Sequence, residues 1–143
     1  MSKVTINRPN RLNVFRDRIC YDMVKVFGDA AEDTSMSVVG LTGVGKRAFS
    51  VGCGDLNWEA KGISAKGTLG IPVKIEHFWA LADIPKPTIA VVRGYAFCGG
   101  HVLHLVCDIK ITSEKARFGQ NGPHVGSYPI IAGESGLWPT SWS

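Results

Sequence analysis

The chain has 143 residues, of which 45% are hydrophobic and 17 are glycine, which suits one packed α/β domain rather than a fibrous or disordered chain. Its net charge of +4 comes from scattered residues, with no basic run and no base-reading motif, which argues against a nucleic-acid partner. The longest apolar stretch, residues 88–92, is too short to span a bilayer. The four cysteines form no CxxC pair and no signal segment opens the chain, so we expect a cytoplasmic protein with reduced thiols.

The predicted elements begin with a strand over residues 3–6 and a turn over residues 7–10. Apolar residues at helical spacing then predict an amphipathic helix over Asp17–Glu32. Residues 36–41 read as a short buried strand. The helix is expected to bury Ile19, Met23, Val26, Phe27 and Ala30 and to expose Arg18, Lys25 and Asp29.

The next part of the chain repeats the alternation of helix and strand. A helix is expected over Val73–Ala82, followed by a proline break and a strand over Thr88–Val92. Strands that alternate with helices predict a mostly parallel sheet. The polar, glycine-containing stretch over residues 57–71 is typical of a loop that closes over a site. The apolar stripe expected on the second helix consists of Ile75, Phe78, Trp79 and Ala82.

Residues 91–104 carry the most informative pattern, a buried strand, a glycine turn and a helix that starts at about Gly100. Such a turn directs free backbone N–H groups at one point, and the positive end of the helix adds to them, as in an oxyanion hole. A second glycine segment, residues 49–55, also follows a strand. On a parallel sheet both segments lie at the carboxyl ends of strands, which favours a catalytic site over a purely structural glycine connection.

Three other patterns are weaker. Residues 40–46 have the glycine and lysine spacing of a P-loop, but Arg47 replaces the magnesium-binding Ser or Thr and no helix is expected to follow, which argues against nucleotide hydrolysis. His101 and His104 share a helix face without a third ligand, so no metal site is predicted. Cys98 at a helix start is a candidate nucleophile, although a small residue in place of glycine is favoured.

Three blocks of motifs are present: Asn7-Arg8-Pro9 with Asn13; Leu41-Thr42-Gly43 with Ala48-Phe49 and Gly54-Asp55; and Lys86-Pro87, Gly94-Tyr95-Ala96, Gly99-Gly100 and Cys107-Asp108. Together they resemble the crotonase (enoyl-CoA hydratase/isomerase) superfamily over residues 4–127. The resemblance implies an α/β fold of ββα superhelix repeats, here incomplete because the C-terminal helical part is lacking. It divides the chain into an acyl-CoA-binding core over residues 1–127 and a divergent tail over residues 128–143, which a change of reading frame would explain.

The resemblance implies a coenzyme A thioester as the substrate, with no tightly bound cofactor and no metal. The carbonyl oxygen would lie between the backbone N–H groups of Gly99 and of either Cys53 or Gly54, because an apparent insertion leaves the second donor open. Paired donors would stabilise the enolate that forms next to a thioester. The implied contacts to coenzyme A are Arg11, Leu12, Val14, Arg16, Lys46, Ser50 and Gly52, with the basic residues as candidates for its phosphates.

Two positions indicate the branch of the superfamily. Hydratases carry glutamates where this chain has Val102 and Gly122, so a simple hydratase is not expected. The glycine turn and residues 118–127 instead resemble dihydroxynaphthoyl-CoA synthase (naphthoate synthase), a lyase that forms a ring carbon–carbon bond through a thioester enolate. Members of that branch use a bicarbonate beside the Gln-x-Gly turn as base, which implies that role for Gln120 and Gly122.

Two alternatives stay open. Residues 67–72, and residues 113–116 together with 118–120, look more like ketocyclohexanecarboxyl-CoA hydrolase, which opens a ring. Both enzymes are expected to carry a catalytic Ser-x-Asp, and here Ser127 is followed by Tyr128 and Pro129. The missing acid favours, as the second alternative, a non-catalytic acyl-CoA-binding or assembly fragment. The resemblance also implies a homo-oligomer, a trimer or hexamer in the full-length family.

Overall fold

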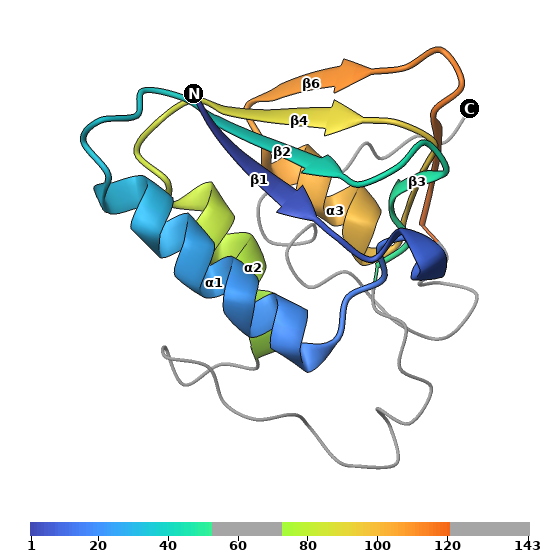
Figure 1. Ribbon diagram of the computed structural model, residues 1–143, viewed down its shortest axis with the longest axis horizontal. Helices are drawn as coiled ribbons and strands as arrows, with labels where there is room; N and C mark the ends of the chain where they lie inside the picture. The colour runs from blue at the N-terminus through green and yellow to red at the C-terminus, as the bar shows by residue number, and fades with distance from the viewer. Residues whose placement is uncertain (53–72, 121–143) are drawn as a thin grey trace.

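The computed structural model describes residues 1–52 and 73–120. They form two sheets of parallel strands, and the helices lie on one side of the larger sheet (Figure 1). The larger sheet contains β1 (Ser2–Ile6), β2 (Val39–Gly43), β4 (Thr88–Val92) and β6 (Ile109–Thr112), in that order. The smaller sheet contains β3 (Ala48–Ser50), β5 (Tyr95–Phe97) and β7 (Arg117–Gly119), in that order. The helices are the 3-10 turn η1 (Pro9–Arg11), α1 (Asp17–Glu32), α2 (Val73–Ala82) and α3 (Gly99–Val106).

The chain alternates between the two sheets and then returns through a helix. Units of two strands and a helix follow one another as β2-β3-α2 and β4-β5-α3, and β6-β7 repeats the two strands. Every pair of neighbouring strands is parallel, with Val39 beside Thr88 and Ile89 beside Ile109 in the larger sheet. The predicted α/β fold of ββα repeats is therefore confirmed.

Helix α1 has the predicted bounds but a slightly different buried face. Met23, Phe27 and Ala30 lie in the core as predicted. Val26 departs from the prediction because its side chain is 39% exposed, and Cys20 is buried in its place. Buried positions 20, 23, 27 and 30 follow a spacing of three or four residues, so the apolar stripe runs past Val26. The exposed face carries the ion pairs Arg18–Asp22 and Lys25–Asp29.

Helix α2 also has the predicted bounds, but the predicted stripe was wrong for two of the three members whose side chains the structure describes, and the side chain of the fourth, Ile75, lies outside the described part. Phe78 is buried as predicted, whereas Trp79 is 38% exposed and Ala82 is exposed. His77 and Leu81 are buried instead. The His77 ring meets Phe15 edge-on, with ring centroids 5.5 Å apart, so a residue with polar ring atoms takes a core position that an apolar pattern does not reveal.

Two strands differ from the sequence prediction for local reasons. The strand expected over residues 36–41 begins only at Val39, because Asp33 closes a turn by accepting hydrogen bonds from the backbone N–H groups of Ser35 and Met36. Strand β5 was not separated from β4 by the sequence pattern. Gly94 (φ +67°) divides them, and a Cβ there would collide with the Arg47 carbonyl oxygen, so glycine allows the chain to cross between the sheets.

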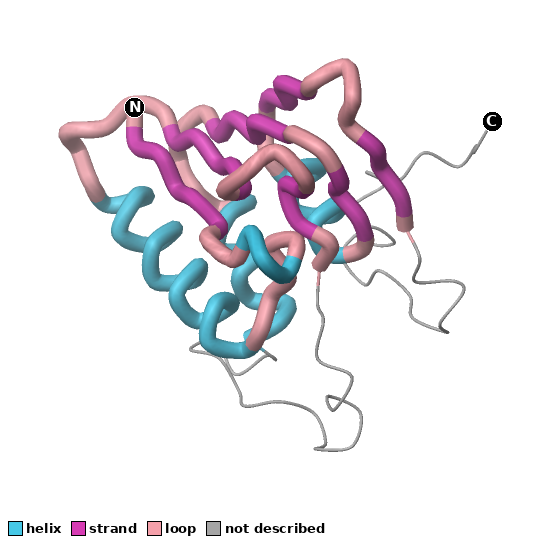
Figure 2. Tube along the Cα trace, turned by 45° about the vertical axis from the view of Figure 1, so that its right-hand side comes forward, coloured by secondary structure: helices cyan, strands magenta, loops and turns pink. Residues whose placement is uncertain are grey.

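The core lies between the larger sheet and the helices, which gather on one side of the strands when the molecule is turned by 45° (Figure 2). Leu41, Ala90 and Val92 of the sheet meet Phe27 of α1 and Leu103 of α3 in this core. Within residues 1–52 and 73–120, no helix has the length and apolar content needed to cross a membrane.

Candidate functional site

The two predicted glycine turns meet in the structure. They follow β3 and β5, which are neighbours in the smaller sheet, so both turns lie at the carboxyl ends of parallel strands. Gly52 has φ +82°, and a Cβ built on it would lie only 2.6 Å from the backbone nitrogen of Gly99. Any side chain at position 52 would therefore lie against the Gly99 N–H, and glycine at position 52 avoids that contact.

The Gly99 N–H has the features of a donor for an anionic oxygen. Gly99 is the first residue of α3, where backbone N–H groups have no partner within the helix, and none of the described residues accepts a hydrogen bond from it. The positive end of the helix dipole lies at the same place. Cys98 adopts φ +48° and ψ −124°, a conformation typical of glycine, and its own N–H donates to the Gly119 carbonyl at 3.0 Å.

Gly52 itself is held by the protein through both of its polar backbone groups. Its N–H donates to the hydroxyl of the buried Ser50 at 3.0 Å, and its carbonyl oxygen accepts from the Phe15 N–H at 2.7 Å. The Ser50 hydroxyl in turn donates to the Asn13 carbonyl at 2.9 Å. Gly52 therefore shapes the turn, and its N–H is already used inside the protein.

Asn13 fixes the loop that supports this turn. It is buried, with φ +55°, a conformation that asparagine tolerates better than most residues. Its side-chain oxygen accepts from the Arg8 N–H at 2.9 Å, and its amide nitrogen donates to the carbonyls of Ala48 at 2.8 Å and Val44 at 3.0 Å. Asn13 thus ties the loop before α1 to the start of β3, a role that the motif alone did not indicate.

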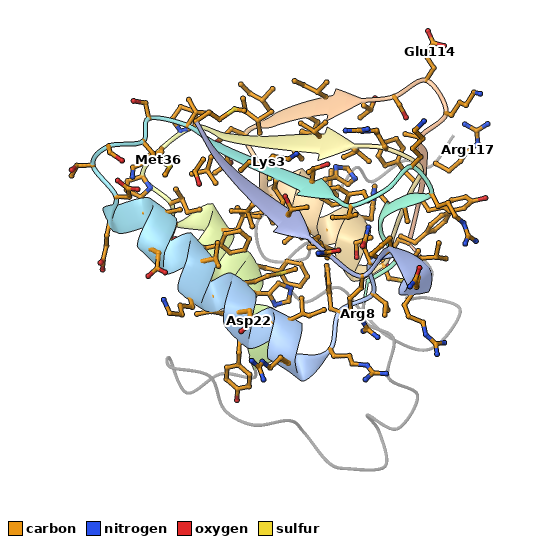
Figure 3. All side chains as sticks on the ribbon, viewed as in Figure 1. Lys3, Arg8, Asp22, Met36, Glu114 and Arg117 are labelled. Carbon is orange, nitrogen blue, oxygen red and sulfur yellow. The ribbon has the colours of Figure 1, made fainter. Side chains whose placement is uncertain are left out.

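The predicted coenzyme A contacts fall into an exposed and an interior group. Arg11, Arg16 and Lys46 are exposed and form no ion pair in the described part of the chain. Ser50 and Gly52 are buried, while Leu12 and Val14 are half-buried in the supporting loop. Arg8 was named from the sequence only as part of a motif and was assigned no role of its own. Arg8 lies beside η1 (Figure 3), and its guanidinium donates to the Val14 carbonyl at 3.3 Å.

Part of the predicted site lies outside the described residues. Gln120 directly follows β7 and is half-buried. Because the preceding Gly119 accepts the Cys98 N–H, Gln120 belongs to the same end of the smaller sheet as the Gly99 turn. The other predicted members, Cys53, Gly54, Gly122 and Ser127, and the loop over residues 57–71, lie outside residues 1–52 and 73–120.

The two histidines of α3 contact each other. The Nε2 of His104 lies 2.8 Å from the Nδ1 of His101. Burial, with smaller contributions from His101 and Lys110, lowers the pKa of His104 to about 4, and burial also lowers the pKa of His101. The ring of Phe49 meets His104 edge-on and that of Phe118 is tilted against it, with ring centroids 6.4 and 5.0 Å away. No group of three His, Cys, Asp or Glu residues suited to a metal occurs in the described ranges.

The nucleotide-binding alternative does not fit the geometry. A P-loop needs a helix directly after its lysine, so that the helix N-terminus faces the phosphates. Here Lys46 lies in a turn, and the residues after it form the strand β3. The glycine spacing of residues 40–46 reflects β2 and its turn: a Cβ on Gly43 would collide with the Phe49 carbonyl oxygen.

Comparisons with known proteins agree with this arrangement. The sequence model described as enoyl-CoA hydratase/isomerase matches residues 1–139. Among solved structures, an enoyl-CoA hydratase from Bacillus anthracis is 28% identical, with a TM-score of 0.79, over 94% of this chain and 52% of its own. An enoyl-CoA hydratase/carnithine racemase from Magnetospirillum magneticum is 26% identical, with a TM-score of 0.79, over 90% of this chain and 48% of its own.

An enoyl-CoA hydratase from Mycobacterium avium subsp. paratuberculosis is 33% identical, with a TM-score of 0.68, over 81% of this chain and 44% of its own. This chain therefore spans about half the length of the solved structures that it resembles.

Proposed function

The chain belongs to the enoyl-CoA hydratase/isomerase family, and from this premise we propose that it binds an acyl-CoA thioester with the carbonyl oxygen at the Gly99 N–H. One observation carries the proposal. The glycine turns after β3 and β5 approach so closely that a Cβ on Gly52 would lie 2.6 Å from the Gly99 nitrogen, and this N–H stands at the positive end of α3.

The chemistry that such a donor supports is stabilisation of a thioester enolate. Removal of a proton next to the thioester places negative charge on the carbonyl oxygen, and a preorganised N–H at a helix start lowers the energy of that charge. A second donor completes an oxyanion hole. Because Ser50 already uses the Gly52 N–H, we assign the second donor to a residue that follows, Cys53 or Gly54.

The reaction that we propose is ring closure by carbon–carbon bond formation, as in the naphthoate synthases that the sequence resembles. Val102, where hydratases carry a glutamate, is buried in α3 and offers no acid or base. Gln120 lies at the Gly99 end of the smaller sheet, so its position fits a bicarbonate held by Gln120 and Gly122. Such a bicarbonate would supply the base that this chain's described helix lacks.

Two alternatives are kept because the sequence favours features of each. A ring-opening hydrolase of the ketocyclohexanecarboxyl-CoA type would use the same oxyanion donors in the opposite direction. A non-catalytic acyl-CoA-binding or assembly fragment would keep the Gly99 donor without the acid that is absent after Ser127. We further propose a cytoplasmic homo-oligomer, a trimer or hexamer, with Arg11, Arg16 and Lys46 near the coenzyme A phosphates.

The test is to measure binding of two matched ligands by calorimetry, a saturated acyl-CoA thioester and the thioether that lacks only the carbonyl oxygen. We expect the thioester to bind at least about tenfold more tightly, which corresponds to about 1.4 kcal/mol for a charge-stabilising donor. Equal affinities would contradict a carbonyl site at Gly99. Deuterium uptake at the carbon next to the thioester in D₂O then separates an enolate-forming enzyme from a binding fragment, which would show none.

A further inference from the structure

A buried hydroxyl connects the loop before α1 to the turn that holds Gly52. Ser50 is the last residue of β3 and is fully buried. Its Oγ donates to the Asn13 carbonyl at 2.9 Å and accepts from the Gly52 N–H at 3.0 Å. A serine hydroxyl has a single proton to donate, so that proton is committed to Asn13 and is not offered to a ligand.

Two backbone contacts connect Ser50 to the Gly99 donor. The first passes through Gly52, whose Cα lies 3.4 Å from a Cβ built on Gly99. The second passes through Gly100, because a Cβ there would collide with the Ser50 carbonyl oxygen. The first turn of α3 therefore packs directly against the backbone of Ser50. A shift of Ser50 would displace both Gly52 and Gly100, the two residues that adjoin Gly99.

We propose that Ser50 is a positioning residue for the acyl-CoA site and that its hydroxyl holds Gly52 where the Gly99 N–H stays open to a carbonyl oxygen. The proposal rests on the proposed function for the identity of the ligand. It differs from the coenzyme A contact that the family resemblance implies for Ser50. The hydroxyl acts through Gly52, and the Phe15 N–H holds the other side of the same residue at 2.7 Å.

The first experiment needs no ligand. Ser50→Ala removes one oxygen from the interior, and Ser50→Thr keeps the hydroxyl. Both variants of the full 143-residue chain are labelled with ¹⁵N-glycine and examined by NMR. In Ser50→Ala we expect the Gly52 amide to exchange with solvent at least about tenfold faster, because its acceptor is gone, and the Gly99 amide resonance to move. Ser50→Thr is expected to restore both signals.

The second experiment uses an acyl-CoA labelled with ¹³C at the thioester carbonyl. Hydrogen bonding to the carbonyl oxygen polarises it, so the ¹³C resonance should move downfield when the wild-type chain binds the ligand. In Ser50→Ala we expect less than about half of this shift, because a misplaced donor polarises the carbonyl less, and an unchanged affinity for free coenzyme A. Ser50→Thr should recover the shift.

Thr42→Val is the matched control, since it removes another hydroxyl that donates to a backbone carbonyl, that of Val91 at 2.8 Å. It should lower the stability and leave the Gly99 resonance and the carbonyl shift as in the wild type. The proposal is overturned if folded Ser50→Ala keeps both signals, or if it loses affinity for free coenzyme A, which would indicate a direct contact. If the wild type binds no acyl-CoA, the proposed function fails, while the glycine amide data still decide the role of Ser50.

Discussion

Gly52 and Gly99 lie so close that a single methyl group on Gly52 would cover the Gly99 N–H. Gly52→Ala would place its Cβ 2.6 Å from the Gly99 nitrogen, at a φ of +82°. Gly45 has a similar φ of +87°, but a Cβ there meets only the Pro9 side chain at 3.6 Å. The two positions thus share the same backbone strain and differ in whether the site is blocked.

We expect Gly52→Ala and Gly45→Ala each to lose about 1 kcal/mol or more of stability, because alanine is strained at positive φ. Only Gly52→Ala should also bind a saturated acyl-CoA at least about tenfold more weakly. Denaturant unfolding and isothermal calorimetry measure the two effects separately. Similar affinities for the two variants would show that the carbonyl oxygen does not lie at the Gly99 N–H.

The backbone of Cys98 is in a strained conformation that glycine would adopt more easily. Its φ of +48° and ψ of −124° lie where residues with a Cβ are rarely found. Cys98→Gly should therefore raise the free energy of unfolding by about 1 kcal/mol, even though glycine is more flexible in the unfolded chain. Urea unfolding checks the sign, and a destabilised variant would mean that the thiol contributes packing that outweighs the strain.

The His101–His104 pair predicts sensitivity to acid. The folded-state pKa of His104, about 4, lies below its value of 6.5 in an unfolded chain, so the unfolded state binds the proton first as the pH falls. The contribution of the neutral His104 to the free energy of unfolding is fully present above pH 6.5. It is lost as the pH falls towards 4, by at most on the order of 3 kcal/mol.

The groups around His104 reinforce this direction, since Lys110 of β6 and a protonated His101 would both repel an imidazolium, and Phe49 and Phe118 offer it no anion. In His104→Phe the curve of unfolding free energy against pH should be flatter between pH 6.5 and 4. Chemical denaturation of both proteins over that range is the measurement, and parallel curves would refute the assignment.

At the scale of elements, Lys86 links a loop to the end of a helix. Its Nζ donates to the carbonyls of Ala30 at 2.6 Å and Asp33 at 2.5 Å, at the C-terminal end of α1. These carbonyls have no partner within the helix, and a cation also suits the negative end of the helix dipole. The lysine of the Lys86-Pro87 motif thus joins α1 to the start of β4.

Lys86→Met keeps most of the apolar stem and removes the donor, so we expect a loss of about 1–2 kcal/mol in the free energy of unfolding. Thermal and denaturant unfolding measure it. Lys25→Met, which breaks an exposed pair with Asp29 on the same helix, is the control and should have a smaller effect. If both variants lose the same free energy of unfolding, the effect of Lys86 comes from surface charge in general and not from its hydrogen bonds at the end of α1.

The bounds of the long elements could be predicted from sequence, because α1, α2 and β4 carry clear periodicity or a compact apolar run. The three-residue strands of the smaller sheet could not, since β5 and β7 are too short for a pattern and are defined by neighbours distant in sequence. The prediction of the buried faces was wrong where a residue with polar atoms, such as His77, lies in the core.

The candidate site was predictable at the level of its turns and not at the level of its supports. Glycine after a strand is a local signal, and it correctly placed the Gly99 turn at the start of a helix. The roles of Ser50 and Asn13 depend on contacts between residues more than thirty positions apart, as in the hydrogen bond from Ser50 to Asn13. Nothing in the residues near Ser50 indicates that contact.

At the scale of the whole molecule, the outer face of the larger sheet exposes an apolar row. Ile109 and Ile111 of the edge strand β6 are 49% and 55% exposed, and they lie beside Ile89 and Val91 of β4. Neighbouring parallel positions point to the same face, so the four side chains form one patch. An exposed apolar patch at a sheet edge favours association between chains.

We expect the chain to self-associate as its concentration rises and Ile111→Lys to weaken that association about tenfold or more, since a buried isoleucine contributes about 1.5–3 kcal/mol. Sedimentation velocity over a range of concentrations measures the effect. Thr5→Lys is the control. Thr5 lies at the opposite edge of the sheet, in β1, in line with Ile111, and its substitution should change little. Association that is unaffected by Ile111→Lys would exclude this face.

The parallel pairing of every strand also sets the order in which the molecule can assemble. Among the strands of residues 1–52 and 73–120, no two neighbours are joined by a hairpin: residue 2 pairs with residue 39, residue 39 with residue 88, and residue 89 with residue 109. Each pairing closes a long loop before it gains a contact, so folding is expected to be slow for a chain of this size. During synthesis, the support around Asn13 and Ser50 emerges well before Gly99, and the donor is fixed only after α3 has left the ribosome and docked.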